Sequence, residues 1–199
     1  MTTETVQNGG GIIPAERIQE MGDCFAAGTL VHIKEGLKPI EEIRVGDWVM
    51  SQPEGSDMSK RSRRPKDEYT YRQVTKTFVH DDQPIVYVTY IQPGADSVKA
   101  PLRVTPNHLI WAKGLVRPSD STASGWIAAG QLKVGHTLAI GYFGNVIVTK
   151  VQDTKETARV YNIEVDEFHT YFVEPLGVWV HNKSLPTFRG TVDVTSRPL

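Results

Sequence analysis

The sequence predicts an all-β fold, and three observations lead to that prediction. Short runs of β-branched and aromatic residues recur along the 199 residues, and Gly, Pro, Asn and Asp separate them. The segments that could form helices are all short. The chain also contains a degenerate internal repeat, which indicates two related halves built from the same strand and turn units.

The predicted strands follow from runs of Val, Ile, Leu, Thr, Tyr and Phe bounded by turn residues. In chain order they are Leu30–Ile33, Asp47–Met50, Val74–Val79, Ile85–Ile91, Leu109–Ala112, Thr137–Tyr142, Val146–Val151, Val160–Val165, Thr170–Val173 and Gly177–His181. The predicted helical segments are Ala15–Met21, a turn at Pro39–Glu42 and a turn at Ala128–Leu132.

The internal repeat pairs segments from the two halves of the chain. The stretch 40–47 echoes 128–136, and the order of 86–88 followed by 107–109 echoes 160–162 followed by 168–170. Two such halves would put His108 and His169 in equivalent positions.

Composition narrows the function classes. The formal net charge is -1, so the overall charge provides no attraction to nucleic acid or to an anionic membrane. No stretch approaches the ~20 apolar residues that a membrane span needs. The first residues have neither a basic start nor an apolar signal core, so we expect no signal peptide and a cytoplasmic location at synthesis. The histidines lack metal-ligand spacing, so we expect neither a metal nor a cofactor.

Two stretches are predicted as loops. Residues 52–70 contain Pro, Gly and Ser and a basic cluster, which favours a solvated insertion loop over a patch for nucleic acid or an acidic partner. The cluster consists of Lys60, Arg61, Arg63, Arg64 and Lys66. Residues 117–125 form the second loop.

The two ends of the predicted domain carry residues that suit cleavage of the chain's own backbone. Cys24, the only cysteine, can attack the carbonyl of Asp23 and convert the peptide bond into a thioester. Asn182 can attack its own backbone carbonyl, closing a five-membered succinimide and releasing Lys183 as a new amino terminus. His181 is the neighbour that can manage the protons.

Three ordered segments carry a family resemblance. They are CFAAGTLVHIKEGLKPIEEIRVGDWVMS, RVTPNHLIWA and ARVYNIEVDEFHTYFVEPLGVWVHN, which together span Cys24 to Asn182. They resemble the opening block, the Thr-x-x-His block and the closing blocks of the Hint superfamily, which includes inteins and hedgehog autoprocessing domains. These segments are most similar in sequence to the bacterial intein-like and pretoxin Hint groups.

The resemblance implies a fold and a set of roles. The fold would be a pseudo-twofold β-horseshoe with short helical turns, in which both chain ends reach one central cleft. Thr105 and His108 match the block that holds and protonates the upstream scissile amide. His169 matches the histidine that helps activate the terminal asparagine, and His181 and Asn182 match the last two residues of the domain.

Two departures from splicing inteins favour cleavage over splicing. Lys183 stands where a splicing intein has Cys, Ser or Thr, so the usual acceptor of the acyl group is missing. Asn162 stands where many inteins have an aspartate that couples the two ends. We therefore expect a domain at 24–182 between an upstream flank, 1–23, and a downstream flank, 183–199.

Other readings remain open for these residues. The cysteine could be a small buried apolar residue, and His108 could cap a turn. Asn182 could be a turn residue that ends a strand, and His169 could be a core histidine. His32, His80 and His136 lack any such context and are interpreted as structural or exposed.

Three hypotheses for function follow. The first is a single-turnover, self-processing domain whose own flanks are its substrate, within a larger host protein or assembly. The second is a Hint scaffold retained as a structural or interaction module that does not cleave. The third is acyl transfer to an outside nucleophile; the His-Asn ending and the lack of an appended sterol-binding region argue against it.

Overall fold

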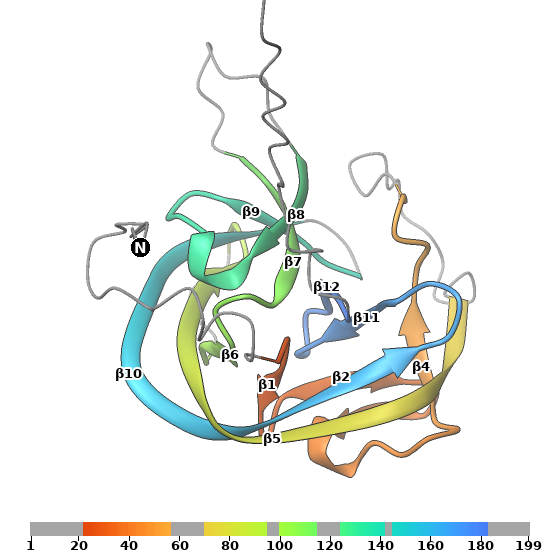
Figure 1. Cartoon of the computed structure of the whole chain (residues 1–199). Helices are drawn as coiled ribbons and strands as arrows, with labels where there is room; N and C mark the ends of the chain where they lie inside the picture. Colours follow the sequence, from red (N-terminus) through yellow and green to blue (C-terminus); the bar gives the residue numbers. More distant parts are fainter. Residues whose placement is uncertain (1–21, 57–69, 95–99, 115–123, 142–144, 183–199) are drawn as a thin grey trace, which may run out of the picture.

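The computed structural model describes residues 22–56, 70–94, 100–114, 124–141 and 145–182. The predicted helix at 15–21, the basic cluster of the insertion, most of the second loop and both outer flanks lie outside these ranges. Within them, twelve strands form one continuous, strongly bent sheet, which confirms the all-β prediction (Figure 1). The described residues contain no helix with the length and apolarity that a membrane crossing requires.

The strands are β1 (Phe25–Ala26), β2 (Leu30–Ile33), β3 (Gly36–Pro39), β4 (Trp48–Ser51), β5 (Thr70–Ile91), β6 (Leu102–Val104), β7 (Leu109–Lys113), β8 (Ser124–Ala128), β9 (Thr137–Ala139), β10 (Asn145–Val165), β11 (Thr170–Val173) and β12 (Val178–His181). Two 3₁₀ turns, η1 (Ile40–Glu42) and η4 (Ala129–Gln131), coincide with the turns that the sequence predicts. The sheet order is β11-β12-β7-β9-β10-β1-β6-β5-β4-β2-β3, with β8 beside β7.

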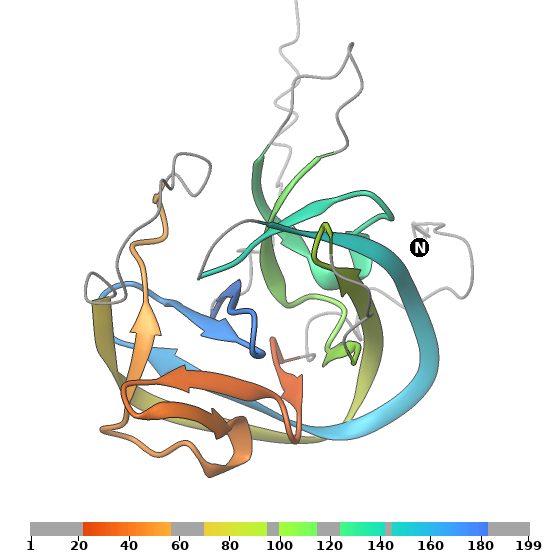
Figure 2. The ribbon, with the colours of Figure 1, turned by 180° about the vertical axis from the view of Figure 1, so that it is seen from behind.

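Strands β5 and β10 form a long antiparallel ribbon that curves around the rest of the molecule (Figures 1 and 2). The apolar runs of the sequence predict two separate strands in each of them, and that prediction is wrong. The polar residues between the apolar runs continue the pairing on the exposed outer side. Asp82 and Lys155 adopt positive φ angles, and the register shifts at several points, so the ribbon bends there without ending.

Four strands were missed by the sequence analysis: β1, β3, β6 and β8. Two of them are only two or three residues long, which is too short for an alternating pattern to be recognised. Strand β3 contains Gly36 and Pro39 and lies at the edge of the sheet, where a proline is tolerated. Strand β8 begins at Ser124, inside the stretch predicted as a loop.

The internal repeat is visible in matching hydrogen bonds. After η1 the Gly46 amide donates to the Val74 carbonyl at 2.9 Å, and after η4 the Gly135 amide donates to the Val148 carbonyl at 2.8 Å. Both glycines have φ near +90°. The two halves therefore repeat the same turn, which joins a 3₁₀ turn to the long ribbon.

The turns also use equivalent side-chain caps. Asp47 Oδ2 accepts the amide of Arg44 at 2.9 Å, and His136 Nδ1 accepts the amide of Lys133 at 3.2 Å. His136 is therefore a turn-capping residue, as its structural interpretation predicted.

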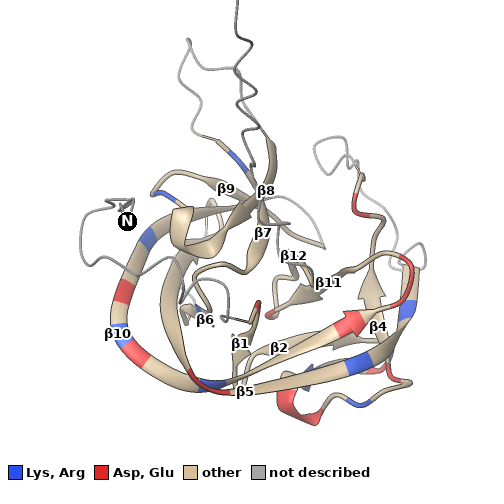
Figure 3. Cartoon of the chain, viewed as in Figure 1, with Lys and Arg blue, Asp and Glu red and all other residues tan. Residues whose placement is uncertain are grey.

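Apolar side chains fill the space inside the bent sheet, and charged side chains of both signs lie along the outer ribbon (Figure 3). Ion pairs such as Lys76 with Glu164 at 3.1 Å join β5 to β10 there. These pairs are exposed, so each contributes little to stability. Two short strands at the centre, β1 and β12, adjoin the two predicted ends of the domain, Cys24 and Asn182.

Candidate active site

The upstream end of the domain is buried at the centre of the sheet. Strand β1 pairs with β10 on one side, through Phe25 and Tyr161, and with β6 on the other, through Phe25 and Val104. Cys24 directly precedes β1, is 1% exposed and packs with Ala26 and other apolar side chains. The peptide bond between residues 23 and 24 thus lies where two long-range strand pairings fix it.

Thr105, which follows β6, holds the amide on the downstream side of that bond. Its hydroxyl accepts the Cys24 N–H at 2.9 Å, and its own N–H donates to the Cys24 carbonyl at 2.9 Å. The hydroxyl also lies 3.2 Å from the same carbonyl, to which it can donate. Because these contacts satisfy both backbone groups of Cys24, they fix the orientation of its amide nitrogen.

His108 is brought to the same place by a tight turn, in which its N–H donates to the Thr105 carbonyl at 3.2 Å. Its ring is fully buried and lies against the ring of Phe25, with centroids 4.1 Å apart. Burial lowers the pKa of His108 from 6.5 to about 3. The Asp23 carbonyl acts against that shift, and the charge of His181 adds to it.

The imidazole of His108 is therefore neutral over most of the pH range. Among the described residues, neither of its ring nitrogens has a hydrogen-bond partner of standard geometry. Since the Asp23 carbonyl affects the pKa of His108, the ring lies close to the peptide bond between Asp23 and Cys24.

The thiol of Cys24 is protonated at neutral pH. Burial, and to a smaller extent the negative charge of Asp23, raises its pKa to about 12. The pKa of Tyr171 is also raised, mainly by burial and to a smaller extent by the charges of Cys24 and Asp23. A nucleophilic role for this thiol therefore requires a group that accepts its proton.

The position expected to couple the two ends is occupied by a buried amide. The Asn162 Oδ1 atom accepts the hydroxyl of Tyr171 at 2.9 Å and the N–H of Ile163 at 2.8 Å. Both bonds use the amide as an acceptor, so Asn162 joins β10 to β11 next to Cys24. This arrangement involves Tyr171, which the sequence analysis did not single out.

The downstream end is carried by the β11–β12 hairpin. Thr170 pairs with His181, and the Asn182 N–H donates to the His169 carbonyl at 2.9 Å. His169 has a φ of 54°, a left-handed conformation that places it at the turn before β11. The side-chain nitrogen and oxygen of Asn182 are buried and have no hydrogen-bond partner among the described residues.

His181 is enclosed on two sides. Its Nε2 atom lies 3.0 Å from a carboxylate oxygen of Glu54, and its ring meets the ring of Trp126 edge-on at 4.9 Å. Its side chain is 6% exposed, whereas that of Glu54 is 55% exposed. The carboxylate thus approaches the imidazole from the solvent side.

The loop that carries Glu54 is tied to the hairpin just before that contact. The Ser51 hydroxyl donates to the Thr170 carbonyl at 2.7 Å, and the Thr170 hydroxyl donates to the Gln52 carbonyl at 2.5 Å. Because Thr170 is the strand partner of His181, these bonds place Glu54 beside the imidazole.

The two ends meet in the middle of the molecule. Strand β12 pairs with β7 through Val180 and Ile110, two residues after His108. The ring of Phe25 lies 6.2 Å from that of Tyr171, and the charge of His181 acts on His108. The structure thus brings together the predicted residues of both ends. Lys183 lies outside the described residues.

Three residues with contacts to these ends were missed by the sequence analysis: Glu54, His80 and Tyr171. Glu54 and His80 are far in sequence from the residues they approach and belong to no motif, whereas Tyr171 lies within the closing block but was given no role there. Only the pairing of distant strands reveals them. His80 is exposed on β5, and its ring lies beside Gly22, one residue before the Asp23–Cys24 bond.

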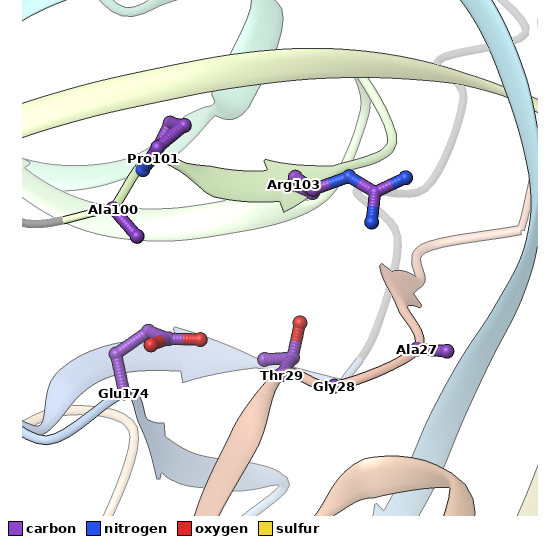
Figure 4. A pocket seen from close by; sticks show the side chains of 7 residues that line it. All are labelled: Ala27, Gly28, Thr29, Ala100, Pro101, Arg103 and Glu174. Carbon is purple, nitrogen blue, oxygen red and sulfur yellow. The ribbon is translucent and has the colours of Figure 1, made fainter.

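A separate cavity of about 160 Å³ lies at the turn that follows β1, lined by Ala27, Gly28 and Thr29 together with Arg103 and Glu174 (Figure 4). It is smaller than the usual pockets for small molecules. None of the predicted site residues lines it, so we assign it no part in the chemistry. Among the described residues, no group of three or more His, Cys, Asp or Glu side chains is arranged to hold a metal ion.

Comparison with known proteins agrees with the all-β fold. A family model described as the pretoxin HINT domain matches residues 30–183. Among solved structures, the chain is similar to a bacterial intein-like domain from Clostridium thermocellum, with 27% identity and a TM-score of 0.60 over 80% of this chain and 99% of that one.

Two inteins share the fold at lower identity. The gp41-1 intein is 20% identical, with a TM-score of 0.56 over 81% of this chain and 99% of its own. A DnaB intein from Synechocystis sp. PCC 6803 is 12% identical, with a TM-score of 0.56 over 81% of this chain and 99% of its own.

Proposed function

Since this chain belongs to the pretoxin HINT family, within the autoprocessing Hint superfamily, we propose that it cleaves its own backbone at two bonds. The upstream bond is Asp23–Cys24 and the downstream bond is Asn182–Lys183. The domain is residues 24–182, and the two flanks are its substrates. The observation that carries the proposal is the contact of Thr105 with the Cys24 N–H at 2.9 Å, next to His108.

In the upstream step, the sulfur of Cys24 attacks the Asp23 carbonyl carbon. The carbon–nitrogen bond breaks, and the amide becomes a thioester with a free amine on Cys24. Thr105 holds the nitrogen that leaves. The neutral imidazole of His108 polarises the bond as a hydrogen-bond donor while negative charge develops on the carbonyl oxygen, and the departing nitrogen takes up one proton from water.

In the downstream step, the side-chain nitrogen of Asn182 attacks its own carbonyl carbon. This closes the succinimide and releases Lys183 with a free amine. Two features support the step: the amide of Asn182 has no competing hydrogen bond within the described part of the chain, and its backbone N–H is fixed by His169. His181, directly before it, is oriented by Glu54 and manages the protons.

Cleavage without ligation is the expected outcome. Lys183 offers an ammonium where a splicing reaction needs a thiol or hydroxyl, so the thioester has no acceptor beside it. Hydrolysis or an added thiol then releases residues 1–23. Asn162 provides an uncharged amide where an aspartate would couple the two steps, which also favours cleavage over splicing.

The test is the mass of the purified protein followed over time, with and without a thiol. The wild-type chain should yield fragments that begin at Cys24 and at Lys183. Cys24→Ala should block only the upstream cut, and Asn182→Ala only the downstream cut, because no other side chain there can form the five-membered ring. An Asn182→Ala protein that still releases a fragment beginning at Lys183 would contradict the role of Asn182 in the downstream step.

A wild-type chain that stays intact in both conditions would instead favour the structural or interaction module. In that case the buried thiol and the neutral histidine would be parts of the core. The two outcomes differ by the mass of a whole flank, so one measurement separates them.

A further inference from the structure

The upstream step needs a group that removes the proton of the Cys24 thiol, and the residues already assigned do not provide one. The thiol is buried and protonated at neutral pH. His108 is a weak base, because burial keeps its imidazole neutral. Thr105 is occupied by the backbone of Cys24.

The ring of His80 lies next to the peptide that is cut. A Cβ atom built on Gly22 would stand 2.9 Å from Cys24 Sγ, 2.9 Å from His80 Cδ2 and 3.2 Å from His80 Nε2. The sulfur and the imidazole therefore approach the same point beside Gly22. Only a glycine leaves that point empty, since real Cβ atoms do not approach other atoms so closely.

The strand register independently puts His80 on the face of the sheet that carries the thiol. Ala26 pairs with Val160 across β1 and β10, and Val160 pairs with His80 across β10 and β5. Residues directly opposite each other in antiparallel strands project to the same face. Val160 and Ala26 belong to the same buried cluster as Cys24, so this is the face of the nucleophile.

We propose that His80 accepts the proton of the Cys24 thiol, and that glycine is required at position 22 because its missing side chain leaves room for that transfer. The inference rests on the proposed upstream cleavage and adds a catalytic residue and a sequence requirement to it. His80 suits the role because its side chain is exposed, so the proton can pass on to solvent.

The step balances as a transfer of one acyl group. The thiol proton moves to His80 Nε2, the sulfur–carbon bond to Asp23 forms, and the carbon–nitrogen bond to Cys24 breaks. The released amine takes up one proton and His80 returns its proton to water. No electrons are exchanged with any other group.

Asp23 is the competing acceptor, since its carboxylate is close enough for its charge to act on Cys24. The experiment therefore compares His80→Gln with Asp23→Asn. Val79→Gln is the matched control, because it places the same side chain on the adjacent, exposed residue, which projects to the opposite face of β5. The readout is the rate of loss of residues 1–23 in the presence of a thiol, measured by mass, with downstream cleavage as the internal reference.

We expect His80→Gln to slow the upstream cut by about 100-fold or more, which is the usual effect of losing a general base, and Val79→Gln to stay near the wild-type rate. His80→Gly should be as slow as His80→Gln, and added imidazole should restore its rate, because the exposed position admits a small base. Gly22→Ala should also slow the upstream cut while leaving the downstream cut unchanged.

Three results would overturn the inference while leaving the proposed function intact. They are a His80→Gln rate equal to that of Val79→Gln, a large loss in Asp23→Asn alone, and a folded His80→Gly protein that imidazole fails to rescue. A wild-type chain that makes no upstream cut would overturn the proposed function itself, and this inference with it.

Discussion

The buried, neutral state of His108 predicts a specific dependence of stability on pH. Its pKa is about 3 in the folded chain and 6.5 in the unfolded chain. Above pH 6.5 neither state holds the proton, so the residue adds no pH dependence. Below pH 6.5 the unfolded chain binds a proton that the folded chain excludes, so stability falls until the pH reaches about 3.

The magnitude follows from the size of the shift. Each pKa unit corresponds to about 1.4 kcal/mol, so the full loss is about 5 kcal/mol, and about 3 kcal/mol of it falls between pH 7 and pH 4.5. That is a substantial part of the free energy of unfolding of an ordinary domain. Because the ring is fully buried, solvent screening reduces the value little.

The assay compares two proteins in a Cys24→Ala, Asn182→Ala background, so that cleavage does not interfere. One retains His108 and the other carries His108→Gln, which does not titrate. Urea unfolding followed by tryptophan fluorescence at several pH values gives the free energy of unfolding of each. The protein with His108 should lose about 3 kcal/mol more than the other between pH 7 and pH 4.5. Equal losses in the two proteins would refute the reasoning, since they would mean that the imidazole binds its proton in the folded state.

Three further predictions concern the reaction. Hydroxylamine or an added thiol should accelerate the upstream cut, since such nucleophiles cleave a thioester. An upstream cleavage rate that neither reagent changes would exclude the thioester. Lys183→Cys should yield some ligated product of residues 1–23 and 183–199, detectable by mass; its absence with both cuts intact would show that the two ends react independently. Glu54→Gln should slow only the downstream cut, by about tenfold, because it removes the carboxylate that orients the imidazole of His181. Glu35→Gln, on an exposed turn, is the control and should leave that rate unchanged. Equal downstream rates in the two variants would show that the Glu54 contact has no part in cleavage.

Much of the fold was predictable because its signals are local. The apolar runs and their turn residues predicted nearly all of the longer inner strands, and the repeated turns of 40–47 and 128–136 predicted two related halves. Pairing through exposed polar residues was not predictable, since nothing in an alternating polar stretch distinguishes a continuing ribbon from a loop. That is why β5 and β10 were each divided into two strands.

The sequence by itself determined which residues have chemistry to offer. A single cysteine and a His-Asn pair carry that information in their identities alone. Only the tertiary structure decided their surroundings. The burial that makes His108 a weak base, the bonds of Asn162 and the approach of Glu54 and His80 all depend on strands far apart in the chain. The physical reason is that solvation and charge interactions are set by distance in space, and distance in space follows from the strand pairing of the whole sheet.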